Sequence, residues 1–221
     1  MTRHLLLCVA LISVITFSCK KENTKEPVTD TTEISDPSQF KVNQAKTISS
    51  RADATSSATA GFVTYLIRRG QHYSDLRPFK TVNVTTMNFL AKFDQSAIYQ
   101  TLNADNQYDI NKLWGFSEGL NNQYNSSRIG WGYSNEAIRL YGYVYSRGVR
   151  YYQEITTVLP QQEINCSIRI AGSTYILSAN GASVTLPRGT TASTAKGLQQ
   201  YPYFGGDEVA PHNISIFIKP L

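Results

Sequence analysis

Residues 164–186 read INCSIRIAGSTYILSANGASVTL, and this stretch decides the fold. It contains two tight-turn signals, Gly172-Ser173 and Asn180-Gly181. Asn-Gly favours a type I′ turn because both central residues need positive φ, and Gly at the first central position suits a type II′ turn. With a two-residue loop at each signal, we expect residues 164–186 to form three consecutive antiparallel strands.

The predicted register places the apolar side chains of these strands on one face. The expected pairs are Ile170 with Tyr175, Ile168 with Leu177, Cys166 with Ala179, Ala179 with Ala182, Leu177 with Val184, and Tyr175 with Leu186. The opposite face would carry Asn165, Ser167, Arg169, Ser178, Asn180, Ser183 and Thr185, with Ile176 as the exception. Two independent turns that agree on one apolar face predict a meander with one buried side.

The rest of the chain has the same character. It has 221 residues, with 14 glycines and 14 tyrosines, and shows no long helical period. Further strands are expected over residues 62–68, 85–93, 98–102, 128–133, 199–204 and 212–218, and residues 137–158 read as a hairpin around Arg147-Gly148. Short strands with frequent turns and no βαβ spacing predict an all-β fold, an antiparallel β-sandwich.

The N-terminal residues have the pattern of a targeting segment. Arg3 and His4 precede the apolar run Leu5–Phe17. A membrane-spanning helix needs about 20 apolar residues, so this run is too short to span and matches the core of a secretory signal peptide. Ser18 and Cys19 follow the run, and lysines come next.

This pattern resembles the lipobox of bacterial lipoproteins, in the looser form of the Bacteroidetes. The resemblance implies that residues 1–18 are removed as a signal peptide and that Cys19 becomes the lipidated first residue, with palmitate among its acyl chains. In such proteins an Asp after the Cys favours retention in the inner membrane. Lys20 stands there instead, so the resemblance implies a lipid anchor in the outer membrane. The alternative is a plain signal peptide that is cut elsewhere.

Residues 19–57 are rich in Lys, Glu, Thr and Ser, and their apolar residues show no period. Such a segment cannot bury enough surface to offset its ordering entropy, so we expect a flexible tether, followed by the β-sandwich over residues 58–221. Cys166 would be the one cysteine of this domain, behaving as a small buried apolar residue. The formal net charge of +5 is spread along the chain without a long basic block, and the protein is expected to lie outside the cytoplasm. We therefore expect no nucleic-acid partner.

A longer pattern over residues 128–218 resembles a known fold. It contains RIGWGY (128–133), the hairpin of residues 138–155, the meander of residues 164–186 and YPYFGGDEVAPH (201–212). This order resembles the concanavalin A-like lectin and glucanase jelly roll, which includes laminin-G-like domains. The whole chain also resembles uncharacterised surface lipoproteins of the Bacteroidetes that carry the YPYFGGDEVAPH segment. The resemblance to the jelly roll implies a β-sandwich and a carbohydrate ligand, whereas the resemblance to these lipoproteins implies no activity.

One face of the predicted hairpin is the first candidate binding surface. A two-residue turn at Arg147-Gly148 places Ile138, Leu140 and Val144 on one side. The opposite side would carry Tyr141, Tyr143, Tyr145, Tyr152, Arg139, Arg150 and Glu154. Flat aromatic rings stack on sugar rings while polar groups bond their hydroxyls, so this face predicts a glycan platform. The alternative is structural, because tyrosine also favours half-buried strand positions.

Two loops supply further candidates. Asp207, Glu208 and His212 follow a Gly-Gly bend close to the C-terminus, where they form either a ligand-binding loop or a solvated turn. Between residues 103 and 111, oxygen-bearing side chains occur at alternate positions, including Asp105 and Asp109. Alternating oxygen ligands are used by Ca²⁺ loops, so Ca²⁺ is the one cofactor considered, and a solvated loop is the competing interpretation.

Catalytic patterns are weak. Glycoside hydrolysis needs two carboxylates about 5–10 Å apart, and no paired-carboxylate strand motif occurs. YPYFGG (201–206) resembles a strand of alginate lyases, but the other motifs of those enzymes are absent. We therefore expect a lectin-like glycan-binding module. The alternatives are a polysaccharide lyase or glycoside hydrolase with an unrecognised site, and a non-catalytic structural or adhesion component.

Overall fold

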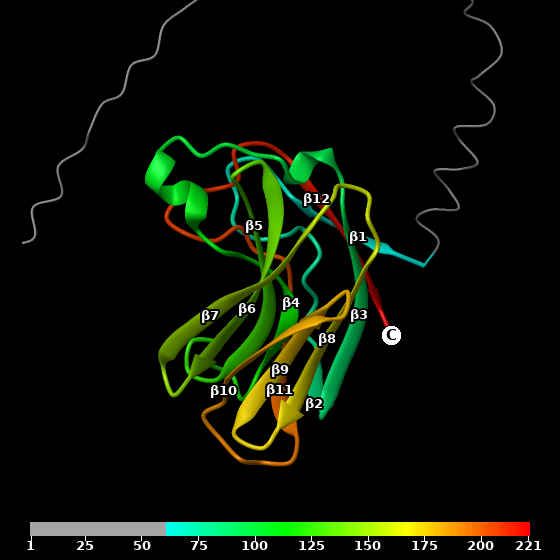
Figure 1. The fold of residues 1–221 in the computed structure, drawn as a ribbon, viewed down its shortest axis with the longest axis vertical. Helices are drawn as coiled ribbons and strands as arrows, with labels where there is room; N and C mark the ends of the chain where they lie inside the picture. The colour runs from blue at the N-terminus through cyan, green and yellow to red at the C-terminus, as the bar shows by residue number, and fades with distance from the viewer. Residues whose placement is uncertain (1–60) are drawn as a thin grey trace, which may run out of the picture. The chain divides into compact units, whose positions relative to one another are not determined.

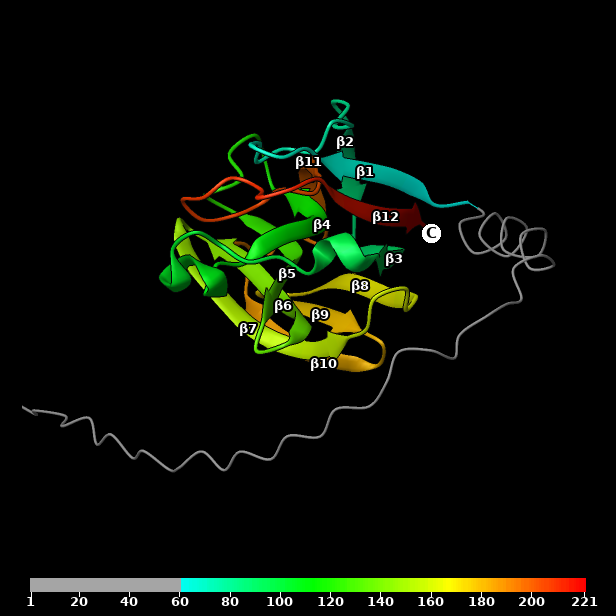
Figure 2. The same cartoon turned by 90° about the horizontal axis from the view of Figure 1, so that it is seen from above.

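The computed structural model describes residues 61–221, which form two antiparallel six-stranded sheets packed face to face. The predicted signal peptide, Cys19 and the predicted tether lie outside the described residues. Figure 1 shows the strands, and Figure 2 shows the sheets as two curved layers. The first sheet runs, in spatial order, β1 (Val63–Ile67), β12 (Ile214–Pro220), β3 (Thr86–Phe93), β8 (Ile164–Ala171), β9 (Thr174–Ala179) and β10 (Ala182–Pro187). The second runs β2 (Thr81–Val84), β11 (Ala195–Gln200), β4 (Asn111–Ser117), β5 (Ser126–Ser134), β6 (Ala137–Ser146) and β7 (Val149–Val158).

The meander of β8, β9 and β10 has the predicted register in all six pairs. Asn180 and Gly181 have φ values of 49° and 87°, as a type I′ turn requires, and Gly172 has a φ of 59°. Cys166, Ile168, Tyr175, Leu177 and Ala179 are completely buried, whereas the polar side faces outward. The predicted antiparallel β-sandwich is therefore confirmed, and the meander forms half of its first sheet.

The core lies between the two sheets. Its largest fully buried side chains are Trp131, Tyr175, Phe89, Phe93 and Phe116. On β5, Ile129 and Trp131 point into the core, whereas Arg128 and Gly130 face away from it. This alternation leaves the outer face of the second sheet free to form a site.

Several segments differ from the prediction. Residues 98–102 are a loop between two 3₁₀ turns, η1 (Gln95–Ala97) and η2 (Ala104–Tyr108), whose N-caps are Asp94 and Asn103. The strand expected at residues 199–204 begins earlier, as β11, and ends at Gln200. Pro202 follows and has no N–H for a strand ladder. The short strand β2 was not predicted. None of the helices among residues 61–221 is both long and apolar enough to cross a bilayer.

Candidate functional site

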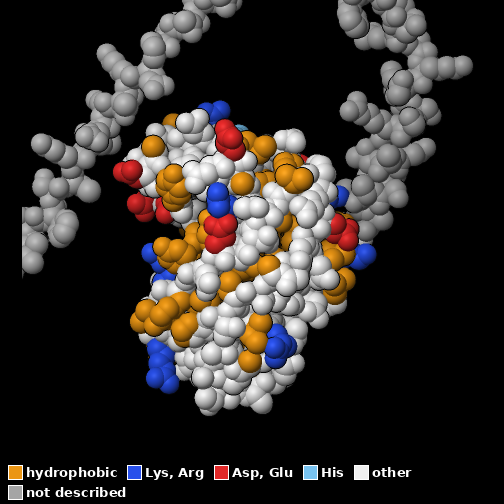
Figure 3. All heavy atoms as spheres, in the orientation of Figure 1, with side chains coloured by type: hydrophobic (Ala, Val, Ile, Leu, Met, Phe, Trp, Pro, Cys, Tyr) orange, Lys and Arg blue, Asp and Glu red, His pale blue; other side chains and the backbone are white. Residues whose placement is uncertain are grey.

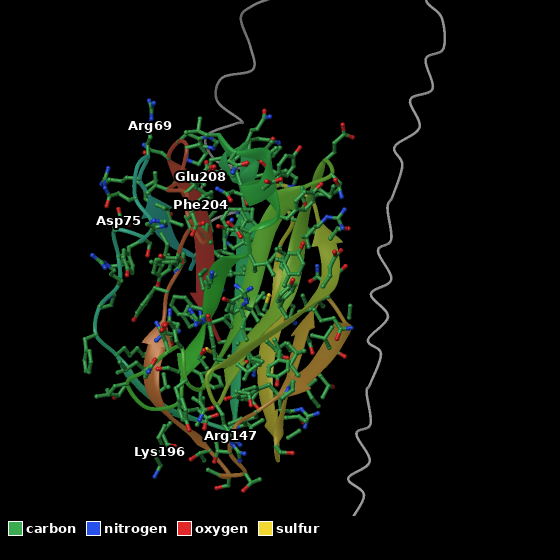
Figure 4. All side chains as sticks on the ribbon, turned by 90° about the vertical axis from the view of Figure 1, so that its left-hand side faces the viewer. Arg69, Asp75, Arg147, Lys196, Phe204 and Glu208 are labelled. Carbon is green, nitrogen blue, oxygen red and sulfur yellow. The ribbon has the colours of Figure 1, made fainter. Side chains whose placement is uncertain are left out.

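A groove with a volume of about 460 Å³ lies on the outer face of the second sheet. Its lining residues from the strands are Lys112 of β4, Arg128 of β5, Tyr143 and Tyr145 of β6, Arg150 of β7, and Gln199 and Gln200 of β11. Connecting segments add Tyr73, Arg77, Asn122, Gln123, Tyr201, Pro202, Tyr203, Gly206 and Asp207. Figure 4 shows the strands of this sheet with the loops of Asp75, Phe204 and Glu208 beside their upper part, and with Arg147 and Lys196 at the lower end.

Arg128 reaches this position because its neighbour across the ladder is a glycine. Gly115 pairs with Arg128, and a Cβ atom at residue 115 would lie 2.7 Å from the Arg128 Cα and 2.8 Å from its Cγ. Gly130 and Gly132 also face outward on β5, where the segment around Asp109 and Ile110 approaches them. The loop thus covers one end of the sheet, and the groove lies at the uncovered end.

The Arg128 side chain is almost completely buried, with 7 % of the residue exposed. Its Nη2 donates to the Asn122 carbonyl and to the Ser126 Oγ, each at 3.1 Å, while its Nε has no partner. The guanidinium lies over the Tyr143 ring, 5.6 Å from its centroid. Burial lowers the pKa of Arg128, but an arginine remains protonated at neutral pH. The groove therefore contains a buried positive charge.

Lys112 lies beside Arg128. Its Nζ donates to the Ile110 carbonyl at 2.7 Å and lies 4.8 Å from the ring centroid of Tyr143 and 5.7 Å from that of Tyr203. Burial, followed by the neighbouring charges of Arg128 and Arg150, lowers the pKa of Lys112 to about 8. The ammonium is still mainly protonated at pH 7, so two adjacent cations occupy the floor of the groove.

Tyrosines form much of the remaining surface. Tyr143 is buried and meets Tyr145 edge-on, with 5.9 Å between ring centroids. Burial and a hydrogen bond with Tyr145 raise the pKa of Tyr143 to about 12. Tyr203 stacks on His72 at 5.2 Å and meets Tyr73 edge-on at 4.9 Å. These contacts fix the rings, so the groove offers preformed aromatic surface.

The predicted hairpin face is divided between several environments. The turn has φ values of 52° at Arg147 and 82° at Gly148, and Tyr143 pairs with Tyr152 across the hairpin. Tyr143, Tyr145 and Arg150 line the groove. Tyr152 lines an adjoining hollow of about 100 Å³, together with Tyr143 and Arg150.

The other three residues of that face do not line the groove. Tyr141 is half-buried and lines neither the groove nor the hollow. Arg139 and Glu154 form an ion pair at 2.9 Å, diagonally across the hairpin, since Glu154 pairs with Tyr141 and Arg139 with Thr157. Of the four tyrosines predicted to form an open platform, Tyr143 and Tyr145 line the groove and Tyr152 lines the hollow beside it.

Of the three residues predicted in the C-terminal loop, Asp207 lines the groove. Glu208 instead accepts hydrogen bonds from the backbone N–H groups of Leu102 and Asn103, both at 2.8 Å. The His212 Nε2 lies 2.8 Å from the Ser96 carbonyl. Glu208 and His212 thus hold the loops around η1 and η2 in place, and neither lines the groove.

The two aspartates considered for Ca²⁺ lie around η2. The backbone N–H of Asp105 donates to the Asn103 Oδ1 at 3.1 Å, and Asp109 lines the smaller hollow. Within residues 61–221, no three His, Cys, Asp or Glu side chains gather in a way that could hold a metal ion. A Ca²⁺ site stays a prediction.

Sequence reasoning missed several residues of the groove. Lys112 was in no motif, Arg128 was predicted only as the start of a strand, and Tyr73 and Arg77 lie in a connection of irregular structure. A signal did exist in YPYFGG, since Tyr201 and Tyr203 line the groove. Gly115 was a second signal, because the space beside this outward glycine is occupied by the Arg128 side chain of the adjacent strand.

Comparisons with known proteins gave structural likeness only. No family model and no curated protein matches the chain. It is similar in structure to the alginate lyase AlyC3, with 10% identity, a TM-score of 0.48, and coverage of 72% of this chain and 74% of that one. A marine PL7 alginate lyase, AlyA1 from Zobellia galactanivorans, gives 14% identity, a TM-score of 0.42, and coverage of 71% and 62%. The carbohydrate-binding module CBM66 from Bacillus subtilis gives 6% identity, a TM-score of 0.35, and coverage of 72% of this chain and 92% of that one.

Proposed function

We propose that this protein binds a glycan in the groove on the outer face of its second sheet. The observation that carries the proposal is the composition of the groove: fixed tyrosine rings beside amide and guanidinium groups. Its volume of about 460 Å³ falls within the range of roughly 300–1,000 Å³ that ligand sites occupy. Tyrosine rings pack on the faces of sugars, and side chains such as Gln200 and Asn122 can bond their hydroxyls.

Binding is better supported than turnover. Among the lining residues of the groove, Asp207 is the only one with a carboxylate, whereas glycoside hydrolysis uses two. A lyase needs an unprotonated base, but burial raises the pKa values of Tyr143 and Tyr203. Lys112 has a lowered pKa, yet its amine is bonded to a backbone carbonyl. Incubating the protein with polysaccharides and measuring new reducing ends or unsaturated products would reveal turnover.

Tyr145→Ala is expected to weaken glycan binding about thirtyfold, since loss of an aromatic anchor typically costs about 2 kcal/mol. Tyr145 lines the groove and is only half-buried, so its removal should leave the fold intact. The measurement is titration calorimetry with a polysaccharide first selected from a panel of neutral and acidic polymers.

Tyr151→Ala is the matched control. Tyr151 lies on β7, pairs with Val144 and points to the opposite side of the same hairpin, so its loss should leave affinity unchanged. Equal losses in both variants, or none in Tyr145→Ala, would place the glycan elsewhere.

We also propose that the protein is carried to the outer membrane as a lipoprotein, which rests on the residues around Cys19. Cys19→Ala should remove the lipid attachment point, so the variant should leave the membrane fraction or remain unprocessed. Membrane fractionation and intact mass measure this. An unchanged mass and an unchanged membrane fraction would contradict lipidation.

A further inference from the structure

The groove and its adjoining hollow are lined by more positively than negatively charged side chains. The cations are Arg77, Lys112, Arg128 and Arg150, and the carboxylates are Asp207 and Asp109. Among residues 61–221 the ion pairs are Arg68 with Asp75, Arg139 with Glu154, and Arg188 with Glu118. None of the four groove cations takes part in these pairs. On the face shown in Figure 3, the acidic side chains lie in the upper half, and the charged side chains of the lower half are Lys and Arg.

A second buried arginine shows what a purely structural arginine looks like in this fold. The Arg188 side chain is fully buried and donates from Nε and Nη2 to both oxygens of Glu118, at 2.7 and 2.8 Å. Its Nη1 donates to the carbonyls of Gly172 and Ala192. Arg128 is similarly buried but has no carboxylate within ion-pair distance and keeps an unpartnered Nε.

A buried charge without a counter-ion is costly, and the cost here is increased by the like charge of Lys112. The fold therefore retains at Arg128 a group that stability alone would not favour. Strained or uncompensated groups of this kind occur where a ligand completes them. An anion bound at the floor of the groove would compensate this charge.

We propose that the ligand is an acidic glycan whose sugar-borne oxyanion lies over Arg128, Lys112 and Arg150. This inference rests on the proposed glycan-binding function and names its ligand class. Guanidinium groups form strong charge-assisted hydrogen bonds with such oxygens. Tyr145 and Tyr203 would contact the sugar ring, while the cations contact its charged substituent. A uronate carboxylate and a sulfate ester share this chemistry.

The test uses matched oligosaccharides. Oligouronates are titrated beside their carboxyl-reduced counterparts, and sulfated oligosaccharides beside their desulfated ones, at fixed ionic strength. We expect at least about a tenfold preference for one acidic series, and the preferred series identifies the oxyanion. Equal affinity for acidic and neutral partners would overturn the acidic-glycan inference while leaving glycan binding in place. Failure of all compounds to bind would overturn the proposed function itself.

Arg128→Met locates the preference within the groove. Methionine keeps a long apolar stem, and the two acceptors of Arg128 remain partnered because the Ser126 Oγ donates to the Asn122 carbonyl at 2.6 Å. The acidic preference should fall to about twofold or less, with affinity for the neutral counterpart nearly unchanged. The melting temperature should stay the same or rise, whereas loss of a structural arginine would lower it.

Arg169→Met is the control, since Arg169 is exposed on β8 in the other sheet and should change nothing. Arg150→Met provides a second variant at an exposed position and should also reduce the acidic preference, should Arg128→Met fail to fold. If both groove variants bind the acidic series as tightly as the wild type, the inference is wrong.

Discussion

Replacing Arg188 with methionine is expected to lower the free energy of unfolding by about 3–5 kcal/mol, the usual cost of breaking a buried ion pair. The Arg188 side chain is fully buried and that of Glu118 is 10 % exposed, so removal of the guanidinium leaves a carboxylate without a counter-ion. The Tyr175 hydroxyl, which also contacts Glu118, lies in the fully buried core. The loss should therefore spread from the loop after β10 into the packing between the sheets.

Chemical denaturation of the wild type and three variants would measure this effect. Glu118→Gln alone should destabilise the protein because Arg188 then loses its counter-ion. The double variant Arg188→Met with Glu118→Gln should recover part of the loss, because no charge remains buried without a partner. Arg68→Met is the matched surface control: its pair with Asp75 is exposed, so we expect about 0–1 kcal/mol. If Arg188→Met lowers the free energy of unfolding no more than Arg68→Met does, the network around Arg188 does not stabilise the fold.

Gly115→Ala is expected to cost about 3 kcal/mol and to reduce binding of the preferred oligosaccharide about tenfold, since overpacking typically costs 1–3 kcal/mol or more. A Cβ atom at residue 115 would lie 2.1 Å from the Ser127 carbonyl oxygen and 2.7 Å from the Arg128 Cα. These are backbone atoms, so the clash cannot be relieved by a side-chain rotation. Strands β4 and β5 must separate locally, which displaces Arg128 in the floor of the groove.

Gly132→Ala separates this effect from the general cost of changing a glycine. Gly132 lies on the same outer face of β5, but the nearest atom to its Cβ position is the Asp109 carbonyl oxygen at 3.5 Å, an ordinary contact. We expect a change in melting temperature of only a few degrees and unchanged binding. Thermal unfolding and calorimetric titration of both variants provide the comparison. If Gly115→Ala is as stable as Gly132→Ala and binds the oligosaccharide as tightly, the close approach of β4 and β5 does not hold Arg128 in place.

The sequence by itself determined the local architecture. The turns at Gly172-Ser173, Asn180-Gly181 and Arg147-Gly148 could be predicted because the φ preferences of adjacent residues select them. Once a two-residue turn is known, the side-chain alternation of a strand assigns each residue to a face. The register of β8, β9 and β10, the burial of Cys166, and the pairing of Tyr143 with Tyr152 all follow from these short-range rules.

The tertiary structure decided which outward-facing residues form a site. Alternation places Tyr141 and Tyr143 on the same face, but only the long-range packing lets Tyr143 line the groove and leaves Tyr141 out of it. Arg128 and Lys112 meet because β4 and β5 pair, and Tyr203 joins them because its segment returns beside β4 from near the C-terminus. Such contacts depend on the order of strands within a sheet, which is set by the packing of the whole core. Adjacent residues determine turns and faces, whereas a groove assembled from distant segments exists only once the two sheets have formed.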